Sequence, residues 1–127
     1  MKPLTFEWID KAEGDFASAQ REIRARKSPN YDAACFHSQQ CIEKYFKARL
    51  QEAGIQFGKI HDLSVLLDLV SPVEPFWEPF RPRLRTLNAY AVEFRYPGQS
   101  ADREAALEAV RICRQVRKVI RESLHVE

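Results

Sequence analysis

Three polar residues follow one another at helical spacing in the first half of the chain: His37, Gln40 and Lys44. Intervals of three and four residues place side chains next to each other on one face of an α-helix. An imidazole, an amide and an ammonium on one face can bind a phosphate or a nucleotide through hydrogen bonds and charge. The alternative is a hydrated helix surface on which Glu43 pairs with Lys47, because charged helix faces are usually solvated.

Two further candidates, Arg95 and Tyr96, stand directly before Pro97, where the sequence predicts the end of a helix. Side chains at a helix end can turn across a bundle towards a neighbouring helix. We therefore predict that both reach the groove bordered by the first three side chains, where they add a guanidinium and an aromatic face to a ligand-binding site. The alternative is that Arg95 pairs with a carboxylate such as Glu43 and that Tyr96 only packs.

The sequence contains no pattern that indicates a metal or a cofactor. His37 and Cys41 are one helical turn apart, but zinc usually needs three or four ligands, and the other histidines and cysteines are not spaced to complete a set. No glycine-rich phosphate loop, HExxH or CxxC motif is present. His61 and Asp62 could form an acid–base pair, although an Asp that begins a helix is more often its cap.

The composition is that of a soluble globular protein, with 127 residues of which 45% are hydrophobic and 30% charged. This length predicts a single domain over residues 1–127. The net charge of +2 does not by itself indicate a nucleic-acid partner. No apolar run is long enough for a membrane span or a secretory leader, and the 3 cysteines suggest free thiols, so we expect a cytoplasmic protein without a membrane partner.

Apolar residues recur at intervals of three and four along most of the chain, which predicts an all-α fold. Long helices are expected over residues 4–26, 30–53, 79–94 and 101–124, with a short helix over 63–70. The third long helix begins at Pro79 or Pro82. Brief loops favour a four-helix up-and-down bundle with an additional short helix. We do not expect Phe76, Trp77 and Phe80 all to fit one core. Those left outside it would form an exposed aromatic patch, which predicts a contact between two copies of the chain and therefore a homodimer.

Four segments, taken in order, resemble the HEPN (higher eukaryotes and prokaryotes nucleotide-binding) domain family. They are Trp8, Ala12, Asp15 and Ala19; Tyr31–Lys44; His61-Asp62-Leu63 with Leu66-Leu67; and Leu87–Tyr90 leading to Arg95-Tyr96-Pro97. The resemblance covers about residues 5 to 124. It implies the same helical bundle, a dimer that binds a nucleotide or RNA, and a partnership with a minimal nucleotidyltransferase in a toxin–antitoxin module.

Some members of that family are metal-independent ribonucleases, in which an Arg is followed after four to six residues by a His. No Arg in this sequence has a His at that spacing, and only three residues separate Arg121 from His125. The resemblance therefore implies binding more than catalysis, and we expect ribonuclease activity of that kind to be weak or absent. Two alternatives remain: a ribonuclease toxin that uses His37 or His61 with Arg95, and a helical dimerisation module without a small ligand.

Overall fold

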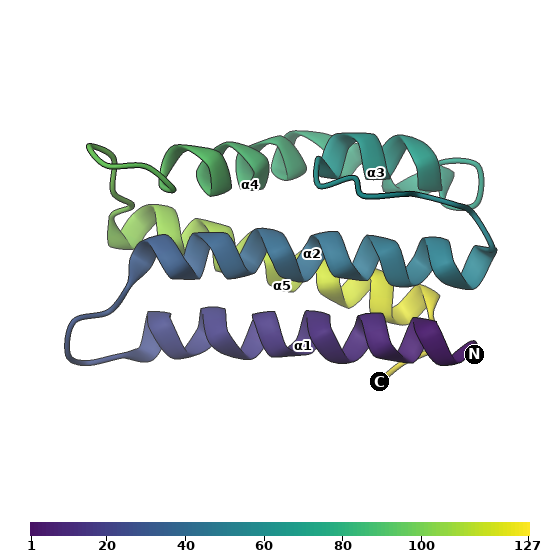
Figure 1. The fold of residues 1–127 in the computed structure, drawn as a ribbon, viewed down its shortest axis with the longest axis horizontal. Helices are drawn as coiled ribbons and strands as arrows, with labels where there is room; N and C mark the ends of the chain where they lie inside the picture. The colour runs from purple at the N-terminus through teal and green to yellow at the C-terminus, as the bar shows by residue number, and fades with distance from the viewer.

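The regular structure of the chain is entirely helical in the computed structural model, which describes residues 1–127. The helices are α1 (Pro3–Arg24), α2 (Tyr31–Ala53), α3 (Leu63–Val70), a 3₁₀ helix η1 (Pro75–Phe80), α4 (Arg81–Glu93) and α5 (Arg103–Ser123). The four longer α-helices alternate in direction, and the short α3 packs against α4 (Figure 1). This architecture confirms the predicted four-helix up-and-down bundle with an additional short helix. None of the helices is both long and apolar enough to cross a membrane.

Local signals in the sequence set most of the helix ends. The side chains of Asn30 and Asp62 accept hydrogen bonds from backbone N–H groups in the first turns of α2 and α3. Gly54 ends α2 with a φ of 72°, a left-handed conformation that glycine adopts without strain. The 3₁₀ helix was not predicted. It begins at Pro75, a first-turn position at which the missing N–H of proline costs no helical hydrogen bond.

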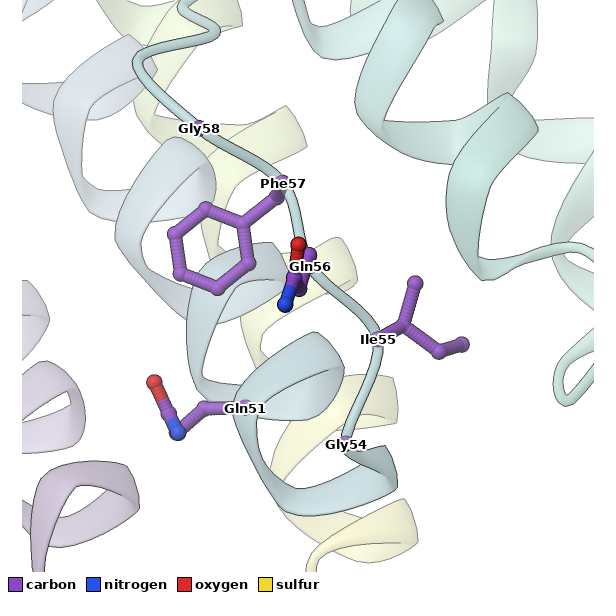
Figure 2. Close-up of a pocket in the computed structure, with 6 residues that line it drawn as sticks. All are labelled: Gln51, Gly54, Ile55, Gln56, Phe57 and Gly58. Carbon is purple, nitrogen blue, oxygen red and sulfur yellow. The ribbon is translucent and has the colours of Figure 1, made fainter.

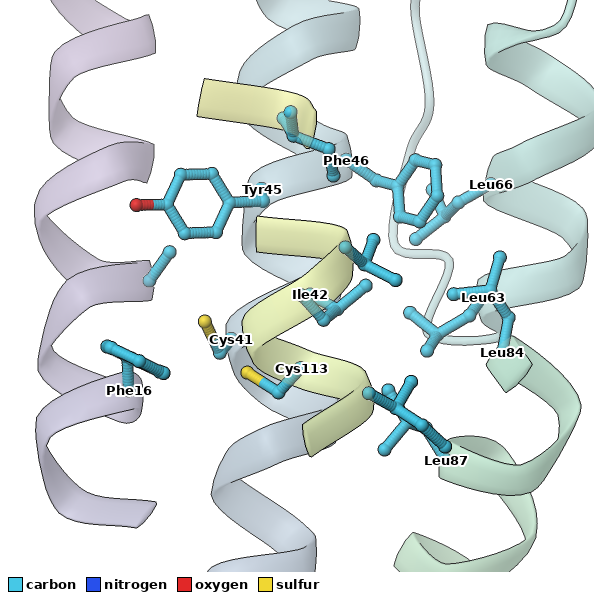
Figure 3. Close-up of a cluster of buried hydrophobic side chains, with 14 of the residues drawn as sticks. Phe16, Cys41, Ile42, Tyr45, Phe46, Leu63, Leu66, Leu84, Leu87 and Cys113 are labelled. Carbon is cyan, nitrogen blue, oxygen red and sulfur yellow. The ribbon is translucent and has the colours of Figure 1, made fainter. Parts of the chain in front are cut away.

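The hydrophobic core surrounds α2, which packs against α1, α3, α4 and α5. Buried side chains from all five α-helices converge on it (Figure 3). Ile42, Tyr45 and Phe46 are the largest that α2 contributes, and all three are fully buried. Because α2 has neighbours on nearly every side, polar side chains along it are also enclosed, more than a hydrated helix surface would allow.

The aromatic patch predicted around η1 is present only in part. Trp77 is buried and packs edge-on against Phe46, with the ring centroids 5.9 Å apart. Phe80 is half-buried beneath the guanidinium of Arg83, whereas Phe76 is 90% exposed. Successive side chains of a 3₁₀ helix point about 120° apart, so Trp77 faces the core while its neighbour faces solvent. Trp77 therefore belongs to the core and not to an exposed patch.

Candidate functional site

A groove of about 470 Å³ opens between α2, the loop that leads into α3, and the C-terminal half of α4. This volume is typical of small-molecule sites. We call it the α2–α4 groove. Its lining consists of Phe36, Gln39, Gln40, His61, Asp62, Asn88, Ala91, Val92 and Arg95.

Side-chain amides from two helices hold the loop at the edge of this groove. The buried Gln39 of α2 donates from Nε2 to the backbone oxygen of His61, at 3.0 Å. Asn88 of α4 donates from Nδ2 to Oδ1 of Asp62, at 2.8 Å, and its own Oδ1 accepts from the backbone N–H of Leu63, at 3.2 Å. The loop is therefore fixed from both sides of the groove. Asp62 caps α3, which is the role that the sequence analysis gave as the alternative to an acid–base pair with His61.

A buried ion pair lies directly behind the loop. The side chains of Glu43 and Lys47 are 4% and 5% exposed, and Nζ lies 3.1 Å from Oε2. The ammonium also lies 5.6 Å from the ring centroid of Trp8 and 5.9 Å from that of Phe57. The predicted pairing of Glu43 with Lys47 is thus present, but inside the protein. A buried pair of charges must be well hydrogen-bonded to offset the cost of removing both ions from water.

The carboxylate of Glu43 also orients the ring of His61. Both of its oxygens lie 3.1 Å from Nδ1 of His61. Because an ionised carboxylate can only accept hydrogen bonds, Nδ1 carries the proton and Nε2 of the neutral ring keeps its lone pair. The His61 side chain is itself 75% exposed. A buried anion therefore holds one ring nitrogen and leaves the rest of the imidazole accessible.

Two of the five predicted ligand-binding residues, Gln40 and Arg95, line the α2–α4 groove. Gln40 donates from Nε2 to Oε1 of Gln39, at 2.7 Å. The guanidinium of Arg95 forms no hydrogen bond or ion pair within the chain, and Glu43, its predicted alternative partner, contacts Lys47 and His61 instead. The groove thus contains an unpaired cation.

The other three predicted residues lie outside this groove. His37 and Lys44 contact the buried Asp15 of α1, with Nδ1 2.8 Å from Oδ1 and Nζ 2.5 Å from Oδ2. At 3.6 residues per turn, positions 37 and 44 point within about 20° of each other, while Gln40 points about 60° away from His37. Tyr96 follows α4 and is 61% exposed. The structure therefore does not bring all five side chains to one groove.

A second charged cluster joins α1, α2 and α5. Arg117 donates from Nε and Nη2 to the two carboxylate oxygens of Glu13, at 2.7 and 2.6 Å. The hydroxyl of Tyr45 donates to the same carboxylate and accepts from Nη1 of Arg121, at 2.9 Å. Partial burial alone would raise the pKa of Glu13, but the bonds from Arg117 and Tyr45 hold it below its ordinary value. These groups satisfy one another, so the cluster connects helices and is not a ligand site.

Other hollows on the protein fit a phosphate less well. One lies at the end of α2 and is lined by neutral residues: Gln51, Gly54, Ile55, Gln56, Phe57 and Gly58 (Figure 2). A larger one, of about 870 Å³, lies between α4 and the start of α5 and has more acidic than basic side chains. No three His, Cys, Asp or Glu side chains come together in a way that could hold a metal ion.

Sequence reasoning missed Gln39 and Asn88. Gln39 is four residues after Cys35 and three before Ile42, so it falls within the apolar stripe of its helix. Asn88 is likewise four residues after the buried Leu84. A buried amide needs hydrogen-bond partners, and this need was the signal that could have marked both positions.

Comparisons with known proteins agree with the resemblance found in the sequence. The family model for the HEPN domain matches residues 5–123. Among solved structures, ST0689, described as an archaeal HEPN homologue, has 25% sequence identity and a TM-score of 0.70, over 97% of this chain and 98% of that chain. No curated protein matches the chain. Because the family model spans nearly all of its residues, the chain belongs to the HEPN domain family.

Proposed function

We propose that the chain binds a phosphate group of a nucleotide or of RNA in the α2–α4 groove. The observation that carries this proposal is the unpaired guanidinium of Arg95 among the lining residues. A guanidinium presents a planar fork of donors that matches two oxygens of one phosphate. Gln40 and the ring of Phe36 line the same groove and can contact a base by hydrogen bonding and stacking.

We propose direct ligand contacts for Gln40 and Arg95 and an indirect role for His37 and Lys44. The latter two cations are already paired with Asp15, so a phosphate would have to compete with a buried carboxylate for them. Their contribution is to fasten α1 to α2, the helix that forms one wall of the groove. Tyr96 follows Arg95 directly and lies outside the lining.

The binding proposal can be tested by titrating ATP and a short single-stranded RNA against three proteins. These are the wild type, Arg95→Ala, and Arg83→Ala as a control at an arginine of α4 that does not line the groove. A hydrogen bond to a charged group contributes about 1.5–3 kcal/mol, so Arg95→Ala should weaken binding at least tenfold while Arg83→Ala binds as the wild type does. Equal affinity of the wild type and Arg95→Ala, or no binding at millimolar ligand, would overturn the proposal.

We also infer that the chain forms a homodimer and is the partner of a minimal nucleotidyltransferase in a toxin–antitoxin module. Membership of the HEPN family supports both roles. Exposed apolar side chains, among them Phe36, Phe76 and Val92, support the dimer. A monomer in sedimentation at micromolar concentration would contradict the dimer. The absence of a nucleotidyltransferase gene beside this one, or failure of the two products to copurify, would contradict the partnership.

A further inference from the structure

We propose that the α2–α4 groove selects guanine among the bases, and that Asp62 is the residue that recognises the Watson–Crick edge of this base. The proposal rests on the proposed function, because the phosphate of the same nucleotide has to bind Arg95. It concerns the part of the lining that a phosphate does not use. This part is formed by His61, Asp62 and Asn88.

The first argument is the hydrogen-bonding capacity that remains on Asp62. Its Oδ1 accepts from the backbone N–H of Ser64, at 2.8 Å, and from Nδ2 of Asn88, also at 2.8 Å. These two bonds use both lone pairs of Oδ1. Oδ2 has no partner within the chain, and Asp62 is exposed on the lining of the groove. One oxygen thus holds the carboxylate in place, and the other is free to accept from a ligand.

The two neighbouring side chains extend this pattern. Asn88 has a second N–H on Nδ2, because Asp62 takes only one, while its Oδ1 accepts from the backbone N–H of Leu63. His61 keeps a lone pair on Nε2, because its Nδ1 donates to Glu43. This part of the groove therefore offers an N–H donor beside two groups that can only accept. All of them belong to side chains that hydrogen bonds within the chain already hold in place.

The second argument compares this pattern with the bases of RNA, which proteins read on their Watson–Crick edges. Guanine carries an acceptor, O6, followed by two adjacent donors, N1–H and the 2-amino group. We match O6 with the N–H of Asn88, and the two donors with Oδ2 of Asp62 and Nε2 of His61. Adenine and cytosine have an unprotonated ring nitrogen where guanine has N1–H, and this nitrogen would meet a carboxylate that cannot donate. Uracil has a single donor between two carbonyl oxygens. Only guanine therefore pairs with all three groups.

The rest of the lining suits the other parts of a guanine nucleotide. The unpaired guanidinium of Arg95 follows α4, whereas Asn88 lies about two helical turns earlier along the chain. The ring of Phe36 lines the same groove and packs edge-on against that of His37, with the ring centroids 5.4 Å apart. A ring held in this way can stack on a base. The groove therefore suits a ligand with an anionic end and an end that donates hydrogen bonds.

The experiment measures the affinities of GMP, IMP, AMP and XMP for the wild type and for Asp62→Asn by isothermal titration calorimetry. IMP is GMP without the 2-amino group. Because a hydrogen bond to a charged group is among the stronger ones, the wild type should bind GMP about tenfold or more tightly than IMP or AMP.

The variant Asp62→Asn should change the preference of the groove. The N–H groups of Ser64 and Asn88 still require an oxygen at the position of Oδ1, so the new amide nitrogen takes the place of Oδ2. This nitrogen donates where the carboxylate accepted, and XMP carries a carbonyl oxygen in place of the 2-amino group of GMP. The affinity for XMP relative to GMP should therefore rise about tenfold or more in Asp62→Asn. A variant that merely fails to fold cannot produce such an exchange, and circular dichroism checks its helical content.

Asp68→Asn is the matched control. Asp68 is an exposed carboxylate of α3 that pairs with Arg81 and does not line the groove. Its replacement removes the same charge as Asp62→Asn. Because salt screens exposed charges that are not in contact, all four affinities should stay within about twofold of the wild type.

The outcomes separate this proposal from the proposed function. Equal affinities for GMP, IMP and AMP, all weakened by Arg95→Ala, overturn the selection of guanine and leave phosphate binding intact. No binding of any nucleotide or RNA overturns both. A preference for GMP that Asp62→Asn retains overturns the role of Asp62. A short oligouridine with one guanosine, compared with GMP and with the same strand carrying adenosine, distinguishes guanine in RNA from a free nucleotide. Equal binding of these two strands, together with no preference for GMP, also overturns the proposal.

Discussion

Replacing Glu43 by Leu should be among the most destabilising single changes in this protein. The hydrogen bond to Glu43 is the only one that the Lys47 ammonium forms, and both side chains are almost completely buried. The substitution leaves that cation facing only the rings of Trp8 and Phe57. Breaking a buried pair by removing one partner typically costs about 3–5 kcal/mol, because the remaining charge stays uncompensated.

This cost is large against the total stability of such a domain, which is usually about 5–15 kcal/mol. For a chain of this size 1 kcal/mol corresponds to roughly 4 °C, so the melting temperature of Glu43→Leu should fall by about 12–20 °C. Urea unfolding followed by circular dichroism should show the same loss as a lower midpoint with an unchanged slope. An unchanged slope would show that the folded state itself remains compact.

The double variant Glu43→Leu/Lys47→Met separates the ion pair from the packing of the two side chains. It removes both charges and keeps apolar volume at both positions, so it should recover most of the lost stability and lie within about 1 kcal/mol of the wild type. The reasoning is refuted if Glu43→Leu alone costs less than about 1 kcal/mol. It is also refuted if the double variant is less stable than the single one, since the unpaired charge would then not be the cause.

Three further predictions concern α1 and η1. Because the pKa of Glu13 is lowered in the folded state, the Glu13 carboxylate stabilises the fold above about pH 4.5, and this stabilisation is lost on acidification. In urea titrations, the difference in unfolding free energy between the wild type and Glu13→Gln should therefore narrow as the pH falls through the folded pKa of Glu13. Gly14→Ala should raise the free energy of unfolding by about 0.5–1 kcal/mol, because an added Cβ on this exposed residue of α1 meets nothing within 4 Å. In thermal melts Trp77→Ala should cost about 3–5 kcal/mol, whereas Phe76→Ala should stay within about 0.5 kcal/mol of the wild type.

The fold was predictable because its signals are local. The apolar stripes and the caps at Asn30, Gly54 and Asp62 each involve residues within a few positions of one another. Even so, the local pattern does not fix which side of a helix is buried: in α5 Ala105 is only half-buried, whereas its neighbour Ala106 is fully buried. The rotation of a helix about its own axis depends on what it packs against, and that information is not local.

The site was less predictable because its contacts join distant parts of the chain. His61 lies in a loop and Glu43 in the middle of a helix, and no periodic pattern relates them. The burial of Lys47 depends on Trp8 of α1 and on Phe57 of the loop. Helical spacing alone could indicate that Glu43 and Lys47 are neighbours. It could not show that the pair is inside the protein.

The missing family spacing also has a different meaning once the fold is known. A search for a His a few residues after an Arg tests one local arrangement, in which a single segment supplies both groups. In this chain the order is reversed, since His61 precedes α3 and Arg95 follows α4. Packing of α2 against α4, together with the amides of Gln39 and Asn88 that fix the loop, brings both residues to the lining of one groove. An imidazole and a guanidinium thus line one groove without the local motif, because their position in space depends on how distant elements pack.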